Sequence, residues 1–562
     1  MVSLFGLFFV LSTLSCQKQL SSIEWDLFVN DFLDAQFVAH PTFAVDAGRH
    51  EFDGKLPDWS TEGLERVISQ LQAQRAQALD FQATSLDEKR RFERDYLLAV
   101  IDEELFWLET AEWPSKNPIF YSGALDPNVY ITRDYAPLAQ RMRAYIKYAK
   151  AVPAAVEHVR NNLRIPLPRT YIDVGRNIFA GLASYYENDV PTVFASVEET
   201  QLQEDLRAAN AAAIDAMKEL TAWFDDQLPN ATEEFAIGSE HFLEMLQKTE
   251  RVDVSLEELK AKGQTDLQRN LDALREACEQ YAPGKSISEC IAKAQAAKPK
   301  GGPVEGARRQ LDDLRAFLLE KALVTIPGTE AAEVAESPPY SRWNFAYINI
   351  PGPYEKGLPS TYYIAPPDPS WSEEDRNAYI PGQADLLFVS VHEVWPGHFL
   401  QYLHAKRSPS TFGQVFVGYA FAEGWAHYSE ELMWEAGLKN RDPETHIGQL
   451  LNALLRNVRY LSAIGLHTEG MTVEESERMF REFAYQDPGN AKQQAARGTF
   501  DPAYLNYTMG KLMIRKLRQE WTAERGGRDA WRAFHDRFLS YGGPPIPLVR
   551  AAMLGTDAGS LF

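Results

Sequence analysis

Residues 391–401 read VHEVWPGHFLQ and place two histidines and a glutamate within seven residues. Neutral imidazole is a common zinc ligand, and a carboxylate beside the metal can take a proton from water. In the familiar zinc-protease helix the two histidines are four residues apart and share one face. His392 and His398 are six residues apart, which separates them by about 120° on a regular helix. They can meet at one metal only where the helix is deformed between them.

The residues between the two histidines supply a cause for that deformation. Pro396 lacks an N–H, and its ring clashes with the carbonyl oxygen four residues back, at His392. Gly397 tolerates whatever backbone angles follow. We therefore predict a bulged or broken helix, with His392 and His398 as zinc ligands and Glu393 as the base beside them. The alternative is a structural histidine pair next to a kink.

A second segment, FAEGWAHYSE at residues 421–430, favours the metal. Glu423 follows His398 by 25 residues, enough for one helix to end and another to return beside it. It is the predicted third ligand, which leaves a position open for water. Glu430 lies two turns further on the same face and can accept a hydrogen bond from a ligand histidine, although it can also be an ordinary charge on an amphipathic helix. His404 and His427 stand at helical spacing from the ligands, and we interpret both as packed or surface histidines.

These segments resemble the bacterial family known as domain of unknown function 885. Its motifs are a His-Glu-x-x-Pro-Gly-His-x-x-Gln helix and a Glu-Gly-Trp-Ala-x-Tyr-x-Glu helix. The likeness extends through most of the chain, in residues 237–242, 465–467, 497–502, 507 and 510–512. The family is similar to helical zinc peptidases of the carboxypeptidase Taq and thimet oligopeptidase groups. The resemblance implies a mainly α, zincin-like fold with a deep metal cleft, and oxyanion stabilisation by Tyr507, with His467 as a second donor.

The N-terminus has the features of an export segment. Residues 3–15 are nearly all apolar or hydroxylic, too short a run to span a membrane, and Cys16 follows. We expect residues 1–16 to be a lipoprotein-type signal peptide with Cys16 lipidated, and the protein to be periplasmic or anchored to the outer membrane. No Lys or Arg precedes the apolar run and Thr13 replaces the usual Leu, so plain secretion and a misplaced start codon stay open.

The other two cysteines, Cys278 and Cys290, flank the turn sequence Tyr281-Ala282-Pro283-Gly284. In an exported chain an isolated pair of this spacing is a disulfide candidate, and two free buried thiols are the alternative.

The resemblance implies one catalytic unit over residues 17–562, and periodicity predicts that it is built mainly of helices. Residues 22–322 show helical spacing, whereas 323–562 begin with short segments rich in β-formers before helices resume. We expect a small antiparallel sheet from residues 324–326, 345–350 and 361–364. Such a sheet can align an extended substrate by strand addition or can be purely structural.

The net charge of −22 and the pI near 5.1 argue against nucleic acid and against anionic membrane surfaces as partners. We expect contact with a membrane only through the N-terminal lipid.

Together these patterns predict a zinc-dependent hydrolase of peptide or other amide bonds, in which Glu393 moves the proton. Two other functions stay open: a hydrolase or lyase of a small non-peptide amide, and a metal-binding surface lipoprotein without catalysis. The presence of Glu393 favours an enzyme, because zinc binding alone needs no base.

Overall fold

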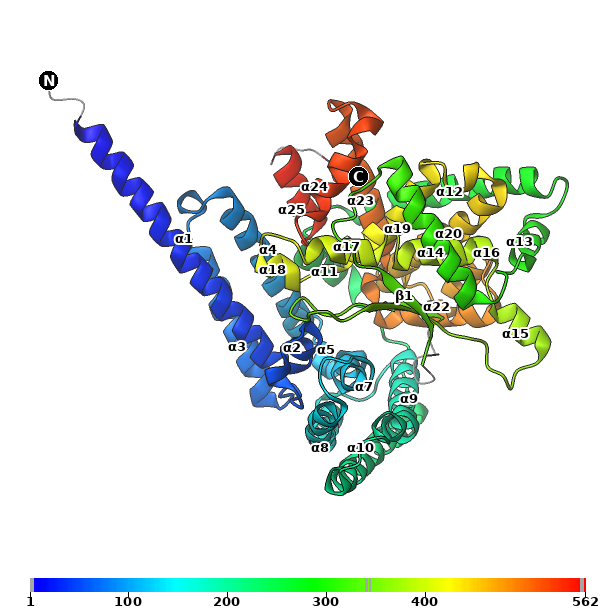
Figure 1. Ribbon diagram of the computed structural model, residues 1–562, viewed down its shortest axis with the longest axis horizontal. Coiled ribbons are helices and arrows are strands. Elements are labelled where there is room, and N and C mark those ends of the chain that lie inside the picture. Colours follow the sequence, from blue (N-terminus) through cyan, green and yellow to red (C-terminus); the bar gives the residue numbers. More distant parts are fainter. Residues whose placement is uncertain (1–4, 339–341, 343–344, 556–559) are drawn as a thin grey trace.

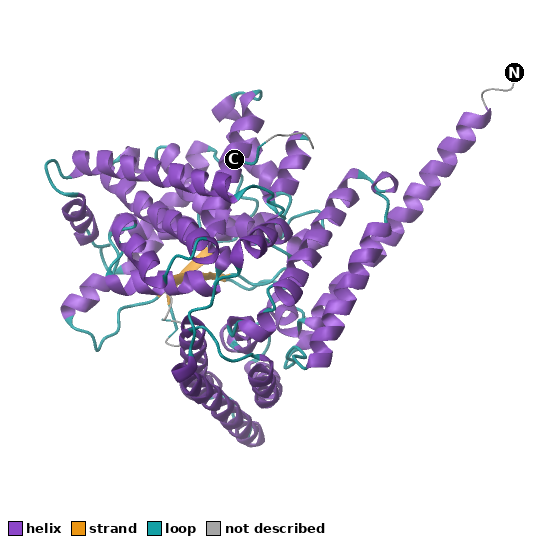
Figure 2. Ribbon diagram, turned by 180° about the vertical axis from the view of Figure 1, so that it is seen from behind, coloured by secondary structure: helices purple, strands orange, loops and turns teal. Residues whose placement is uncertain are grey.

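The computed structural model describes residues 5–338, 342, 345–555 and 560–562, and side chains from residue 21 onward. The fold is mainly helical, as predicted, with one small sheet enclosed by helices (Figures 1 and 2). Among the described residues, no helix combines the length and the apolar composition needed to cross a bilayer.

The first part of the chain is a set of helices, of which α1 extends outward from the body with the N-terminus at its outer end (Figure 1). Helices α8, α9 and α10 pack along one another as a bundle. The main helices are α1 (Phe5–Ala39), α2 (Pro41–Ala47), α3 (Thr61–Asp80), α4 (Glu88–Leu105), α5 (Trp113–Lys116), α6 (Ile119–Ser122), α7 (Asn128–Thr132), α8 (Leu138–Asn162), α9 (Arg169–Phe194) and α10 (Thr200–Gln227).

The second part carries the metal-site segments. Its helices are α11 (Gly238–Glu250), α12 (Leu256–Tyr281), α13 (Ile287–Ala296), α14 (Pro303–Lys321), α15 (Glu373–Tyr379), α16 (Gln383–Glu393), α17 (His398–Ala405), α18 (Thr411–Val415), α19 (Tyr419–Glu435), α20 (Pro443–Thr468), α21 (Val473–Phe483), α22 (Pro488–Phe500), α23 (Asn506–Ala523), α24 (Trp531–Leu539) and α25 (Ile546–Leu554). Cys278 of α12 and Cys290 of α13 form a disulfide, as their spacing predicts.

Buried apolar residues form two large cores. One runs from Trp25 to Phe224 and includes Phe412, and the other contains most of the buried residues from Phe242 to Val549. Helices α11–α14 therefore pack with the metal-site half of the molecule. The packing boundary lies earlier in the chain than the change from helical to β-rich sequence at residue 322.

The sheet has three strands in the order β1-β3-β2, with β1 at Ala332–Glu336, β2 at Ala346–Asn349 and β3 at Ser360–Ile364. Strand β2 pairs antiparallel with β3, but β1 pairs parallel with β3. The expectation of a wholly antiparallel sheet was therefore wrong. Strand β1 reads AEVAE, and the Ala and Glu that dominate it are poor strand formers, so its sequence gave no indication of pairing.

The expected strand at residues 324–326 does not form. The Thr325 N–H donates to Asp536 Oδ1 at 2.7 Å, and the Thr325 carbonyl oxygen lies 2.8 Å from His404 Nε2. Side chains thus satisfy both backbone groups of Thr325, which leaves nothing to pair with a neighbouring strand.

The sheet lies against the first metal-site helix. Tyr362 of β3 is fully buried, and its hydroxyl lies 3.4 Å from Ser390 Oγ of α16. Among the described residues, strand β2 pairs with β3 alone, and its residues line the cavity described below.

Candidate metal centre

The helix that carries the two histidines is broken, as the Pro-Gly pair predicts. Helix α16 ends at Glu393 and α17 begins at His398, and the Trp395–Pro396 peptide between them is cis. The Gly397 N–H donates to the carbonyl oxygen of Val391 at 2.9 Å, which closes a wider loop than one helical turn. The indole N–H of Trp425, on α19, donates to the Pro396 carbonyl oxygen at 2.8 Å. The break is therefore tied to the helix that carries Glu423.

Helix α19 is held close to α23 by two glycines. A Cβ on Gly424 would lie 2.5 Å from the Cα of Gly510. This contact brings Glu423 of α19 and Tyr507 of α23 to the same cavity.

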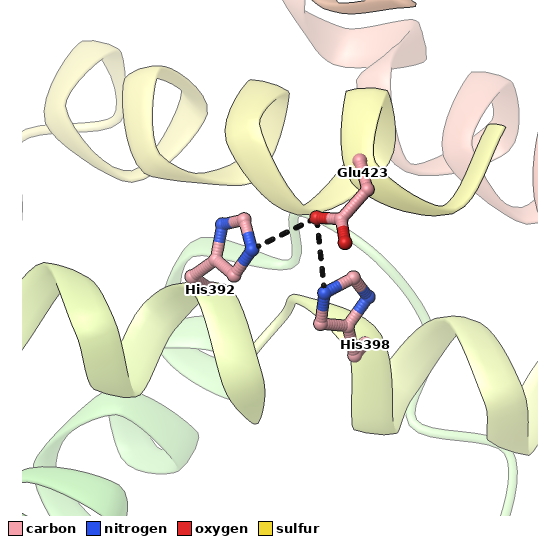
Figure 3. A group of neighbouring side chains, drawn as sticks. All are labelled: His392, His398 and Glu423. Atoms are coloured by element: carbon pink, nitrogen blue, oxygen red, sulfur yellow. Dashed lines mark hydrogen bonds and ion pairs between the residues drawn. The ribbon is translucent and has the colours of Figure 1, made fainter. Parts of the chain in front are cut away.

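His392, His398 and Glu423 converge (Figure 3). Glu423 Oε2 lies 3.1 Å from His392 Nε2 and 3.3 Å from His398 Nε2, and the three ligand atoms are all within 4.8 Å of one another. Ligands at about 2.0–2.2 Å from a tetrahedral zinc are roughly 3.3–3.6 Å apart. The two distances from Glu423 are close to this spacing, so His392, His398 and Glu423 could together hold a zinc ion.

Glu430 contacts His392 on the side of the ring that faces away from Glu423. Its Oε1 lies 2.8 Å from His392 Nδ1 and 3.2 Å from Arg456, and its Oε2 lies 3.2 Å from His427 Nδ1. A proton on His392 Nδ1 donated to Glu430 leaves Nε2 without a proton and so able to bind a metal. The position of Glu430 is thus the one expected of a carboxylate that orients a ligand histidine.

Electrostatics around the cluster follow from burial and from these contacts. Burial and Arg456 lower the pKa of His392, but its hydrogen bonds to Glu423 and Glu430 outweigh them and raise it to about 9. Burial works against the charged form of Glu430, yet Arg456 and His427 hold its pKa far below the usual range. Burial likewise opposes the charged form of Glu423, but His398 and His392 hold its pKa well below the usual range, so both carboxylates beside His392 are ionised.

Glu393 lines the cavity next to the two ligand histidines. Among the described residues its carboxylate has no hydrogen-bond partner. Burial raises the pKa of Glu393, and the charges of His398 and His392 oppose that rise. A carboxylate that faces the cavity with its oxygens free is suited to accept a proton there.

The two residues proposed as oxyanion donors are separated in the structure. Tyr507 lines the cavity, and its ring lies 6.2 Å from the ring of His392, nearly parallel to it. Burial, with the nearby charge of Glu423, raises the pKa of Tyr507 and keeps the phenol protonated. His467 lies at the far end of α20, with Nε2 2.7 Å from the Gly498 carbonyl oxygen and Nδ1 3.4 Å from the Ile237 N–H. It is not among the cavity residues, and backbone groups engage both its nitrogens.

The other two histidines are packed, as expected. His404 Nε2 lies against the Thr325 carbonyl oxygen. His427 is fully buried and contacts Glu430 rather than the ligand group. Burial, with Lys511 second, lowers the pKa of His427 to about 4.

The cavity beside the cluster has a volume of about 780 Å³, within the range typical of ligand sites. Among the cationic residues that line it, sequence reasoning missed Arg133 and, on α20, both Arg456 and Arg459. Arg456 and Arg459 are three residues apart from each other, in a helix whose residues are almost all buried. Two arginines on one face of a buried helix were the available indication of a polar site.

Fold and site together define a large helical protein with a two-histidine, one-glutamate cluster at an open cavity. The sequence matches the family model described as bacterial protein of unknown function (DUF885) over residues 41–553, and the chain belongs to that family. No functionally curated protein matches it.

Two solved structures share the fold. A candidate lipoprotein of unknown function from Shewanella oneidensis has a TM-score of 0.78 and 24% sequence identity, covering 94% of this chain and 99% of that one. A candidate lipoprotein from Colwellia psychrerythraea has a TM-score of 0.77 and 17% identity, covering 96% and 98% respectively. At these identities the likeness concerns the fold.

Proposed function

We propose that this protein is a zinc-dependent hydrolase of peptide bonds. The observation that carries the proposal is the placement of Glu393, whose free carboxylate faces the cavity beside a three-ligand metal cluster. His392, His398 and Glu423 would hold the zinc, which when bound lowers the pKa of its water and polarises the substrate carbonyl.

The chain's own residues account for the remaining steps. Glu393 accepts the proton of the attacking water and delivers it to the leaving amine. The Tyr507 phenol, protonated and lining the same cavity, donates a hydrogen bond to the oxygen that gains charge. Glu430 holds the His392 ring in place.

Strand β2 favours a peptide over a small non-peptide amide as the substrate. Its residues line the cavity, and within the part of the chain that the structure describes only β3 pairs with it. An extended peptide can add to such an edge through main-chain hydrogen bonds, whereas a small amide gains nothing from it.

The decisive experiment compares the wild type with Glu393→Gln. Glutamine nearly preserves shape but has no basic carboxylate, so zinc content should stay unchanged while hydrolysis falls by about 10²–10⁴-fold. Zinc is measured by metal analysis and hydrolysis with the best substrate from a peptide library. Glu374→Gln, at an exposed position of α15, is the control for loss of a glutamate. Undiminished hydrolysis at full zinc occupancy would remove Glu393 as the base, and a zinc protein with no hydrolysis of peptides or small amides would be a metal-binding protein only.

We further propose that the protein is exported as a lipoprotein, with Cys16 as the lipidated first residue of the mature chain. The sequence of residues 3–16 supports this, as do the descriptions of the two structural neighbours. The Cys278–Cys290 disulfide is consistent with an oxidising compartment. Intact-mass analysis after expression in a Gram-negative host should show a lipidated Cys16 and no free thiol. An unprocessed chain that begins at Met1 and carries two free thiols would contradict export.

A further inference from the structure

Three guanidinium groups surround the ring of Tyr507. The central carbons of Arg456, Arg459 and Arg497 lie 5.7, 5.0 and 6.0 Å from its centroid. All three arginines line the cavity, so their charges act on whatever enters it. Like charges this close repel one another unless counter-charges are present.

Two of the three have a carboxylate partner. Arg456 lies 3.2 Å from Glu430 and also donates to Asn452. Arg497 lies 2.9 Å from Asp501 and donates to the Tyr419 hydroxyl at 3.0 Å. A fourth arginine of the cavity wall, Arg133, lies 3.6 Å from Asp46.

Arg459 differs from them. Its Nε donates to the amide oxygen of Gln494 at 2.8 Å, and among the described residues no carboxylate approaches its terminal nitrogens. Only 8% of the residue is exposed. Burial, followed by the charge of Arg497, lowers the pKa of Arg459. A buried cation without a counter-ion is costly, which indicates that this one is kept for a ligand.

The carboxylates at the metal cluster would not neutralise the charge of Arg459. A divalent ion there would be balanced by Glu423 and Glu393, and Glu430 is already engaged by Arg456. With such an ion bound, the cavity would carry one positive charge in excess, on Arg459.

We propose that Arg459 binds a carboxylate of the substrate and so determines specificity. The two terminal nitrogens of a guanidinium match the two oxygens of a carboxylate, with charge-assisted hydrogen bonds. This inference rests on the proposed peptidase function, which supplies a substrate that carries such a group. The carboxylate is either the C-terminus of the peptide or an Asp or Glu side chain.

The distance between Arg459 and the metal cluster limits which peptide bond of a bound substrate can be cut. Arg459 lies 5.0 Å from the Tyr507 ring, which lies 6.2 Å from the His392 ring. The guanidinium is thus within about three extended residues of the metal ligands. A C-terminal carboxylate bound there places the cleaved bond near the end of the peptide, which makes the enzyme a carboxypeptidase or a dipeptidase.

The test measures binding separately from turnover. Zinc-loaded full-length Glu393→Gln protein is titrated calorimetrically with N-acetyl-trialanine as the free acid and as the C-terminal amide. The acid should bind about 10- to 100-fold more tightly, the effect of hydrogen bonds between charged groups. With Arg459→Met added, this preference should vanish while the affinity for the amide stays the same. Arg481→Met, an exposed arginine of α21, controls for the loss of one positive charge.

A second pair of probes identifies the source of the carboxylate. Amidated peptides that differ only by Glu or Gln report a side-chain carboxylate, and their discrimination should likewise depend on Arg459. Arg459→Lys keeps the charge but not the paired geometry, so it should retain part of the preference. Arg459→Lys also replaces Arg459→Met in the test if the methionine variant fails to fold. Zinc content and thermal denaturation would reveal such a failure.

The outcomes separate this inference from the function on which it rests. Equal binding of acid and amide together with equal binding of the Glu and Gln peptides would overturn it, as would a preference that survives Arg459→Met. Peptide hydrolysis by the wild type without any carboxylate preference would leave the peptidase proposal standing and remove this one. A carboxylate preference that depends on Arg459, without any hydrolysis, would leave carboxylate binding by Arg459 standing and remove the peptidase proposal.

Discussion

The carbonyl oxygen of His392 occupies the place that a side chain at Gly397 would need. A Cβ built on Gly397 would lie 1.7 Å from that oxygen. This close approach leaves no room for a side chain at position 397 and is a direct reason for glycine there. The main chain of the first ligand thus packs directly against the residue that precedes the second.

Gly397→Ala should therefore displace α16 from α17 and weaken zinc binding. The added methyl cannot be accommodated without moving a ligand histidine, and displacement of about 1 Å is enough to disrupt a metal site. Zinc affinity is measured by competition with a chelator. Gly181→Ala is the control, because a Cβ there meets nothing within 4 Å. Wild-type affinity in Gly397→Ala would show that the break does not position the ligands.

Alanine substitution of each ligand should remove most of the bound zinc. His392, His398 and Glu423 each supply one of three atoms, and two ligands hold zinc far more weakly than three. His404→Ala should keep its zinc because that imidazole contacts the Thr325 carbonyl oxygen, and His427→Ala should also keep it. Metal analysis of the five purified variants decides the matter, and full occupancy in Glu423→Ala would exclude that residue.

Glu430→Gln should reduce zinc affinity by about 10–100-fold without removing a ligand. The amide keeps the shape of the side chain but loses the charge that faces His392 and Arg456. Chelator competition at constant pH measures the change, with Glu482→Gln at an exposed site of α21 as control. An unchanged affinity would show that Glu430 serves folding alone.

A histidine outside the site makes stability depend on pH. His50 lies 3.0 Å from Asp53 and 3.1 Å from Glu355, and it joins the segment after α2 to the loop between β2 and β3. Burial lowers its pKa, but hydrogen bonds to Asp53 and Glu355 outweigh this and raise it from 6.5 to about 9. The folded state therefore holds the proton more tightly than the unfolded state.

The contribution of His50 to stability should be complete below about pH 6.5 and should be lost as pH rises to about 9. Denaturant unfolding of wild type and His50→Gln over roughly pH 6 to 10 measures it, because the difference between the two curves should shrink with rising pH. Exposed His241→Gln is the control. A constant difference across the range would mean that the ion pairs with Asp53 and Glu355 contribute nothing.

Parts of the site could be predicted because their cause is local. The spacing of His392 and His398 and the Pro-Gly pair between them require a broken helix on the grounds of covalent geometry alone. Cys278 and Cys290 are joined across one turn between neighbouring helices, so their short separation was sufficient.

The sheet and the second oxyanion donor show where local reasoning fails. Short segments do not encode strand direction, so the parallel pairing of β1 with β3 depended on how the chain crosses the sheet. His467 shares a helix with Arg456, but α20 is long enough to carry it away from the cavity to Gly498. A residue that belongs to a family motif, such as His467, therefore need not lie at the cavity that other residues of its helix line.

By itself, the sequence determined the candidate ligand residues, the break between them and the helical class of the fold, because these follow from residue chemistry and short-range spacing. Only the tertiary structure placed Arg459 at the cavity, with no carboxylate partner among the residues it describes, and placed Glu430 between His392 and Arg456. The physical reason is that a charge acts through its neighbours in space. Here those neighbours come from α16, α19, α20 and α23, whose arrangement is set by how their buried faces pack.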